Sequence, residues 1–115
     1  MNSRQLEKHC AEPWVSHLQS GVKQVEGRLK KGDFAELQAG DQVTWFDGDK
    51  RVPTRIVCIR EYPSFLSYLS GEGVSNVLPG VDTIEKGLEI YYQYFTEQDR
   101  SMYPVLAIQV ERLES

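Results

Sequence analysis

The sequence predicts an α+β fold: a small, mixed and partly open β-barrel of about five strands flanked by short helices. Three observations lead to this prediction. Several short segments combine β-branched or aromatic residues with turn residues at their ends. Helical segments lie between them without the strand–helix–strand regularity of a parallel sheet, and the strands are too few for a sandwich. The chain has 115 residues, of which 40% are hydrophobic, which suits one domain over residues 1–115.

The first helix is expected after a weak strand pattern at residues 4–11. Pro13 suits the first turn of this helix because its missing N–H would have no partner there anyway. Gly21 can adopt the left-handed conformation that ends many helices. Because a helix of about two turns is not stable alone, Trp14 is expected to pack on the sheet.

Three further strands are expected in the first two thirds of the chain. Residues 22–29 form the second strand, and residues 42–46 form the third because they are β-branched and aromatic. A helical or turn segment at residues 32–37 and a tight turn at residues 39–41 connect them. Residues 51–60 form a longer strand that is expected to be central, since its apolar residues point to both faces.

The last third of the chain alternates helices and loops before a final strand. A short helix at residues 65–69 is predicted after a cap at Ser64, and a glycine-rich loop follows at residues 70–80. A capping box at residues 82–85 predicts the next helix, and a second cap at residues 96–99 predicts another short one. A mostly buried strand is predicted at residues 104–111. The helix from Ile84 is the clearest element, because apolar residues recur at helical spacing as far as Phe95.

Three charged residues lie close together in the second predicted strand. Lys23, Glu26 and Arg28 are bracketed by Gly21 and Gly27, where the backbone can bend or be closely approached. Alternation in a strand puts Glu26 and Arg28 on one face, whereas Lys23 has the wrong parity. Lys23 therefore belongs to the turn after the helix, or a bulge resets the register. The cluster suits a polar ligand, and a solvated surface ion pair is the alternative.

Composition excludes several classes of protein. The formal net charge of −4 argues against a strongly basic protein that wraps nucleic acid. No apolar run approaches the roughly 20 residues of a membrane span, and the first residues contain no signal-peptide pattern. Cys10 and Cys58 are expected to be reduced, buried thiols of a cytoplasmic protein, although a disulfide between them stays open.

No cofactor or metal is expected. Neither His9 nor His17 has the spacing of a metal site. Cys10 follows His9 directly, but adjacent strand residues point to opposite faces, so the pair does not suit nucleophilic catalysis. Ser64 lacks a nucleophile-elbow context and is interpreted as a cap.

Several short motifs occur in the order of one known family. They are Glu12-Pro13-Trp14, the run from Gly21 through Lys23, Glu26 and Arg28 to Leu29, the Gly40-Asp41 turn, Tyr62-Pro63-Ser64-Phe65, Val77-Leu78-Pro79-Gly80, the helix from Tyr91 to Phe95, and the segment from Tyr103 to Ile108. This ordered set covers nearly the whole chain and resembles the activating-signal-cointegrator homology (ASCH) family. The resemblance implies a PUA-like β-barrel, a cleft lined by the Gly-x-Lys-x-x-Glu-x-Arg motif, and RNA or modified nucleotides or nucleosides as partners.

The first functional hypothesis is therefore a binding module for RNA or a modified nucleotide. Lys23 and Arg28 would contact phosphate, and Glu26 would accept a hydrogen bond from a base. Trp14 or Tyr62 would stack on that base, as aromatic residues do on single-stranded RNA. For Trp14, and for Trp45, a role in the core is the alternative, because small barrels need large side chains to fill them.

The second hypothesis is a hydrolase acting on a modified nucleoside or on RNA. Some small bacterial ASCH relatives are amidohydrolases that release the acetyl group of acetylated cytidine with a lysine, a threonine and a glutamate, and ribonuclease activity is also associated with the family. Lys23 matches that lysine, and Glu72 is the candidate for that glutamate. Glu26 stands in place of the threonine and lacks its hydroxyl, so Lys23 would act with Glu26 or Glu72 as acid–base partner. An interaction domain without a small ligand is a third possibility.

Overall fold

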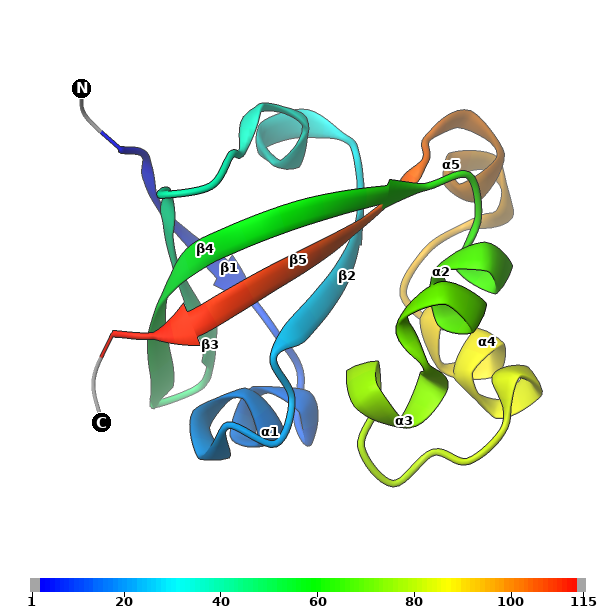
Figure 1. Cartoon of the computed structure of the whole chain (residues 1–115), viewed down its shortest axis with the longest axis horizontal. Helices are drawn as coiled ribbons and strands as arrows, with labels where there is room; N and C mark the ends of the chain where they lie inside the picture. The colour runs from blue at the N-terminus through cyan, green and yellow to red at the C-terminus, as the bar shows by residue number, and fades with distance from the viewer. Residues whose placement is uncertain (1–2, 114–115) are drawn as a thin grey trace.

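The sheet consists of five strands in the order β1-β3-β4-β5-β2 (Figure 1). The computed structural model describes residues 3–113. The strands are β1 (Gln5–His9), β2 (Val25–Leu29), β3 (Gln42–Asp47), β4 (Lys50–Tyr62) and β5 (Val105–Arg112). Neighbours are antiparallel, except that β1 runs parallel to β3. Because β1 and β2 are the two edge strands of this curled sheet, it forms a half-barrel, which confirms the predicted α+β class.

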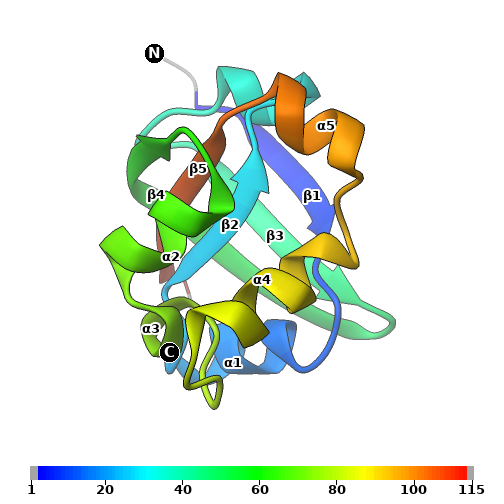
Figure 2. The ribbon, with the colours of Figure 1, turned by 90° about the vertical axis from the view of Figure 1, so that its right-hand side faces the viewer.

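The helices are short, and most of them lie on one side of the sheet. They are α1 (Trp14–Ser20), the 3-10 helix η1 (Gly32–Glu36), α2 (Phe65–Glu72), α3 (Val74–Val77), α4 (Ile84–Tyr92) and α5 (Glu97–Met102). Helices α2 to α5 gather beside β2 and β5, whereas α1 lies at one end of the half-barrel (Figures 1 and 2). None of the helices within residues 3–113 is long and apolar enough to cross a membrane.

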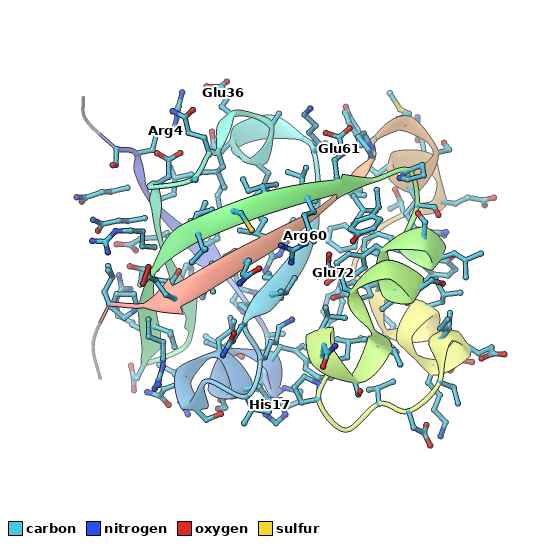
Figure 3. All side chains as sticks on the ribbon, in the orientation of Figure 1. Arg4, His17, Glu36, Arg60, Glu61 and Glu72 are labelled. Carbon is cyan, nitrogen blue, oxygen red and sulfur yellow. The ribbon has the colours of Figure 1, made fainter. Side chains whose placement is uncertain are left out.

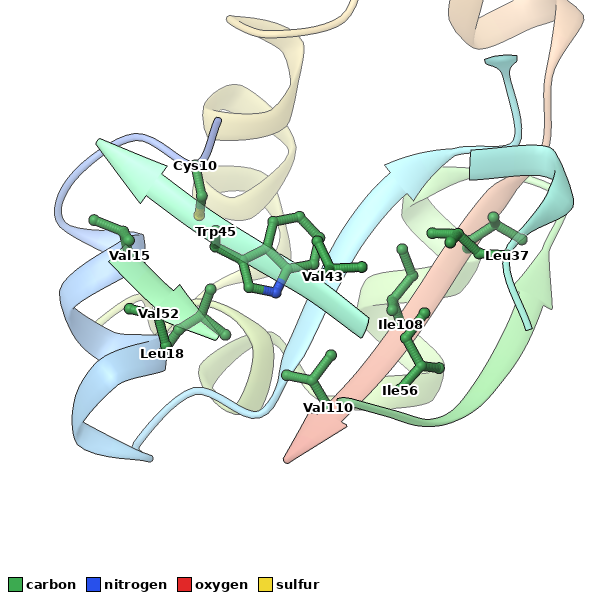
Figure 4. Close-up of a cluster of buried hydrophobic side chains, with 11 residues drawn as sticks. Cys10, Val15, Leu18, Leu37, Val43, Trp45, Val52, Ile56, Ile108 and Val110 are labelled. Atoms are coloured by element: carbon green, nitrogen blue, oxygen red, sulfur yellow. The ribbon is translucent and has the colours of Figure 1, made fainter. Parts of the chain in front are cut away.

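Two buried clusters lie on the two faces of the sheet. The cluster inside the curl consists of Cys10, Val15, Leu18, Leu37, Val43, Trp45, Val52, Ile56, Leu106, Ile108 and Val110 (Figure 4). The cluster between the sheet and α2–α4 consists of Val25, Leu29, Phe65, Tyr68, Leu69, Val77, Leu78, Tyr91, Val105 and Ala107. Trp45 is fully buried in the first cluster, as its core interpretation predicted. Trp14 is partly buried and packs against both clusters.

The second strand is shorter than predicted, because β2 begins at Val25 and not at residue 22. Gly21 has the predicted left-handed backbone, with φ of 85°, and ends α1. The backbone N–H of Lys23 then donates to the carbonyl of His17 at 3.0 Å, which keeps this segment against the end of α1 and out of the sheet. Lys23 therefore belongs to the turn after the helix, as one of the two alternatives predicted, and not to a bulged strand.

The prediction of a loop over residues 70–80 holds only for the turn at residues 78–80 and is wrong for most of the segment. Helix α2 continues to Glu72, and α3 follows at Val74–Val77. One of the three glycines that suggested a loop, Gly71, lies in the helix where the ring of Tyr62 packs, and a Cβ there would be 2.6 Å from that ring. The glycine is therefore required by a contact between α2 and β4, which local sequence does not reveal.

Helix starts and the central strand agree with prediction more closely. Ser64, Thr83 and Thr96 cap α2, α4 and α5 by accepting hydrogen bonds from backbone N–H groups. The capping box predicted at residues 82–85 is thus replaced by a cap at Thr83. β4 is central, between β3 and β5, with a bulge at Val57.

Candidate functional site

The structure brings Lys23, Glu26 and Arg28 together, although only two of them lie in a strand. Glu26 and Arg28 project from the same face of β2, which is the edge strand beside β5. The ammonium of Lys23 reaches back from the preceding connection to Glu26 Oε1 at 3.1 Å. The three charges therefore form one buried cluster, with Glu26 between two cations.

Glu26 is the centre of this cluster. Its Oε2 accepts a hydrogen bond from Arg28 Nε at 2.8 Å and lies 2.7 Å from Arg28 Nη2 in an ion pair. Only 9% of its side chain is exposed. Burial by itself would raise the pKa of Glu26, but Lys23 and Arg28 outweigh that effect and hold the pKa below its ordinary value. Glu26 is therefore a carboxylate that can only accept hydrogen bonds.

Lys23 positions Glu26 and has no donor left for a ligand. An ammonium has three N–H donors. They are directed to the carbonyl of Val25, to the carbonyl of Val77 at 2.6 Å and to Glu26. The side chain is fully buried. Lys23 thus links α3 to β2 and holds the carboxylate of Glu26 in place.

Arg28 bridges the two edge strands of the half-barrel. Its Nη2 donates to the carbonyl of His9, at the end of β1, at 2.7 Å. Its guanidinium also lies over the rings of Trp45 and Phe34, 5.2 Å and 5.4 Å from their centroids. Burial alone would lower the pKa of Arg28, but Glu26 outweighs it and raises the pKa. Arg28 is therefore a permanently charged group beside the gap between β1 and β2, which we call the seam.

A pocket of about 250 Å³ lies at the seam, lined by His9, Cys10, Ala11, Trp14, Glu26, Gly27, Arg28, Leu78, Ile90, Tyr91, Tyr94 and Phe95. One wall is the end of β1, and a second is the edge strand β2 with the charged pair. The third wall is aromatic and comes from α4 and the residues that follow it. The seam pocket thus combines a polar strand edge with flat aromatic surfaces.

The backbone of Gly27 contributes to the polar edge. Val110 N donates to the carbonyl of Gln24, so residues of β2 at even positions are bonded to β5. Alternation in an antiparallel pair then directs the N–H and C=O of Gly27 away from β5. The carbonyl of Val25, which has the same parity, indeed accepts from Lys23. Because Gly27 has no side chain, its backbone N–H and C=O are accessible from the pocket.

Cys10 is at the pocket but is not an activated nucleophile. Its thiol donates to Glu26 Oε2 at 3.7 Å. Burial, and next the negative charge of Glu26, raise the pKa of Cys10 to about 12. Cys10 and Cys58 are both free thiols, and Cys58 is only partly buried.

Three of the predicted site residues do not line the pocket: Lys23, which contacts Glu26, and the pair Glu72 and Tyr62. Gly27 pairs with Ala107, which pairs with Arg60 of β4, so Arg60 is on the face of the sheet opposite to Glu26. Arg60 holds Glu72 through two hydrogen bonds of 2.7 Å and 2.8 Å (Figure 3). Tyr62 donates to Glu72 at 2.6 Å. Glu72 and Tyr62 therefore belong to a second cluster, and the structure does not bring them to Lys23 and Glu26.

Sequence reasoning missed the aromatic wall of the pocket. Trp14 was a candidate and does line the pocket, but Tyr91 and Phe95 were interpreted only as the apolar side of a helix, and Tyr94 was not considered. Tyr91 and Phe95 do have that spacing, and the same face that packs on the sheet ends at the seam. No cluster of three or more His, Cys, Asp or Glu side chains that could hold a metal ion occurs within the described residues.

Fold and site together define a class: a small α+β half-barrel with a polar pocket at its seam. No model of a known protein family matches the sequence, and no curated protein matches it. Solved structures do match. The crystal structure of hypothetical protein PH0355 has 33% sequence identity over 95% of this chain and 99% of that chain, with a TM-score of 0.88.

A second relative, protein PF0455 from Pyrococcus furiosus, was solved by NMR and is 33% identical over 96% of this chain and 99% of that chain, with a TM-score of 0.80. The chain therefore belongs to the family of PH0355 and PF0455. Protein EF3133 from Enterococcus faecalis V583, assigned to DUF984, also matches with a TM-score of 0.68. The match covers 98% of this chain and 82% of the EF3133 chain. Its 13% identity shows only that the fold is shared.

Proposed function

We propose that this protein is an ASCH-type, PUA-like domain that binds a nucleotide, free or within single-stranded RNA, with the base in the seam pocket. The observation that carries the proposal is the composition of that pocket, in which flat aromatic side chains face a strand edge with free hydrogen-bonding groups. A base needs both features, because it stacks through its faces and is recognised through its edge.

The aromatic wall supplies the stacking surface. Trp14 of α1, and Tyr94 and Phe95 in the turn after α4, line the pocket from two separate segments. Stacking of one base on an aromatic side chain contributes about 1–3 kcal/mol and does not depend on which base it is. Tyr94 is 51% exposed, so it is accessible to a ligand at the mouth of the pocket.

The strand edge supplies the hydrogen bonds. Glu26 is an acceptor, and the backbone of Gly27 offers one donor and one acceptor. Both are held rigidly, Glu26 by Lys23 and Arg28, and Gly27 by the sheet. Fixed donors and acceptors bind a base more tightly than mobile side chains do, because little conformational entropy is lost on binding.

Arg28 supplies the positive charge for a phosphate. It lines the seam pocket and also a neighbouring groove of about 500 Å³, which Lys8 and Lys31 flank. Those lysines pair with Asp33 and Asp99 on the surface. The chain as a whole is acidic, and tight binding of long nucleic acid needs many unpaired cations. A single nucleotide or a short single strand is therefore the ligand that this charge distribution suits.

The hydrolase alternative has less support. Lys23 could act as a base only as a neutral amine, but its head group donates to three acceptors and is enclosed. The other proposed partner, Glu72, is on the opposite face of the sheet. Cys10, which lines the pocket, is kept as a thiol. A binding site is the function that these contacts favour.

Two neighbouring tyrosines allow a matched test. Tyr94 lines the seam pocket, whereas Tyr92, which is 45% exposed, does not. Isothermal titration calorimetry with AMP, CMP, GMP, UMP and short single-stranded RNAs measures binding to the wild type and to Tyr94→Ala and Tyr92→Ala. We expect Tyr94→Ala to weaken binding about tenfold and Tyr92→Ala to leave it unchanged. Equal effects of the two variants, or no binding of any probe, would overturn the proposal.

A further inference from the structure

Two buried tyrosine hydroxyls meet at the wall of the seam pocket, which Tyr91 lines. The hydroxyl of Tyr68, in α2, lies 2.9 Å from the hydroxyl of Tyr91, in α4. Tyr68 is fully buried, and Tyr91 is 5% exposed. Within residues 3–113 neither hydroxyl has another hydrogen-bond partner.

A count of protons shows that this pair is incomplete. Each hydroxyl carries one proton, and a single hydrogen bond between them uses one of the two. The other proton has no acceptor among the described residues. Leaving such a donor buried and unpaired costs about 1–3 kcal/mol, so its position on the pocket wall calls for a physical reason.

The free proton is better placed on Tyr91 than on Tyr68. Tyr68 is enclosed on every side, and its hydroxyl is so close to Gly27 that a Cβ there would be 2.6 Å away. Tyr91 lines the pocket beside Glu26 and Gly27, whereas Tyr68 does not line it. If Tyr68 donates to Tyr91, the remaining proton of Tyr91 can be donated into the pocket. The opposite arrangement would enclose the unpaired proton completely.

The electrostatic surroundings keep Tyr91 a donor. Burial, and next the negative charge of Glu26, raise the pKa of Tyr91. The phenol is therefore protonated at neutral pH. Glu26, nearby on the pocket wall, is a carboxylate and can only accept.

We propose that Tyr91 donates its phenolic proton to an acceptor atom on the Watson–Crick edge of the bound base, next to an N–H group that Glu26 accepts. The inference rests on the proposed nucleotide-binding function. All four common bases carry an acceptor beside an N–H donor on this edge, so the chemical class that it assigns to the ligand is nucleotides whose Watson–Crick edge is free of alkyl groups. A methyl group on the ring nitrogen of that edge removes or blocks one of the two hydrogen bonds.

The two tyrosines provide matched variants. Tyr91→Phe and Tyr68→Phe each remove one hydroxyl of the same pair. A purely structural pair would give equal effects, whereas the proposal requires only Tyr91→Phe to weaken binding. Tyr91→Phe also leaves the Tyr68 hydroxyl unpaired and lowers stability. The double variant removes both hydroxyls and restores stability, because two apolar groups then replace the pair.

The experiment is titration calorimetry with AMP, CMP, GMP and UMP, and with the tightest binder methylated at N3 of a pyrimidine or N1 of a purine. We expect Tyr91→Phe and the double variant to bind the tightest nucleotide about five- to tenfold more weakly, and Tyr68→Phe to bind it as the wild type does. The wild type should bind the methylated nucleotide at least about tenfold more weakly.

Three results would overturn the assignment of Tyr91: wild-type affinity of Tyr91→Phe, an equal loss in Tyr68→Phe, or full affinity for the methylated nucleotide. In all three the wild type still binds a nucleotide, so the proposed function survives. If the wild type binds none of the four nucleotides, the proposed function fails, and the assignment of Tyr91 fails with it.

Discussion

Two arginine–glutamate pairs lie on opposite faces of the sheet, and their contact distances are nearly the same. Arg28 approaches Glu26 at 2.7 Å and 2.8 Å, and Arg60 approaches Glu72 at 2.7 Å and 2.8 Å. They differ in their surroundings. The Arg28 side chain is 18% exposed and the Arg60 side chain is 38% exposed. Glu26 also has a second, fully buried cation, whereas Glu72 has a tyrosine hydroxyl.

The comparison teaches that the ion pair by itself does not identify a site. Glu26 lies on an edge strand, where a free backbone edge and an aromatic helix enclose a pocket. Glu72 lies at the end of α2 and links this helix to β4 through Arg60 and Tyr62. Neither Glu72 nor Arg60 lines the seam pocket. Its network explains how the helical layer is held on the sheet. The variants below test whether the two pairs differ in this way.

The largest effect is expected from Glu26→Ala. This change leaves two buried cations without their counter-ion, and removing one partner of a buried pair costs about 3–5 kcal/mol. Urea unfolding followed by circular dichroism measures the loss in the free energy of unfolding. A loss below about 1 kcal/mol would show that the cluster is solvated and would remove the contrast with Glu72.

Glu72→Ala is expected to cost about 1 kcal/mol, because Arg60 is partly exposed and can turn to solvent. The same urea titration measures this loss, and Lys86→Ala is the matched control. Lys86 pairs with Asp82 on the surface, where both side chains are mostly exposed, so its removal should have almost no effect. A cost for Glu72→Ala as large as for Glu26→Ala would mean that the two clusters are equivalent.

At acid pH, the contribution of Glu72 to the free energy of unfolding should be lost. Hydrogen bonds from Arg60 are the main cause that lowers the pKa of Glu72 from its ordinary value of 4.5. A carboxyl with a lowered folded-state pKa stabilises the protein fully above about pH 4.5, and this contribution is lost as the pH falls through the folded-state pKa. The stability difference between the wild type and Glu72→Gln should therefore narrow below pH 4.5. A difference that stays constant down to pH 2 would contradict this.

The smallest effect concerns the two thiols, which also lie on opposite faces. Burial and the charge of Glu26 raise the pKa of Cys10 to about 12, so little thiolate is present at neutral pH. Cys58 is partly buried beside Arg60. Iodoacetamide should label Cys58 on the order of tenfold faster than Cys10 in the native protein, as peptide mass spectrometry can measure. Faster labelling of Cys10 would show that the seam pocket activates its thiol.

Part of the candidate site could be predicted because its residues are close in sequence. Lys23, Glu26 and Arg28 lie within one short stretch, and a short stretch can only place them near one another. Two other candidates lie apart from this stretch for an equally physical reason. Tyr62 belongs to β4, whose register with β5 decides to which face of the sheet its side chains point, and Glu72 of α2 is bound on that face by Arg60 and Tyr62.

The sequence by itself determined the class of fold, most strands and the helix starts. Apolar periodicity, the Ser and Thr caps and the left-handed Gly21 act over four residues or fewer, so they are visible in the chain. Only the tertiary structure decided which carboxylate adjoins a pocket. The aromatic wall comes from Tyr91 to Phe95 and the polar edge from Glu26 to Arg28, which are distant in the sequence. They meet only because β2 pairs with β5 along one side and leaves its other edge free beneath α4.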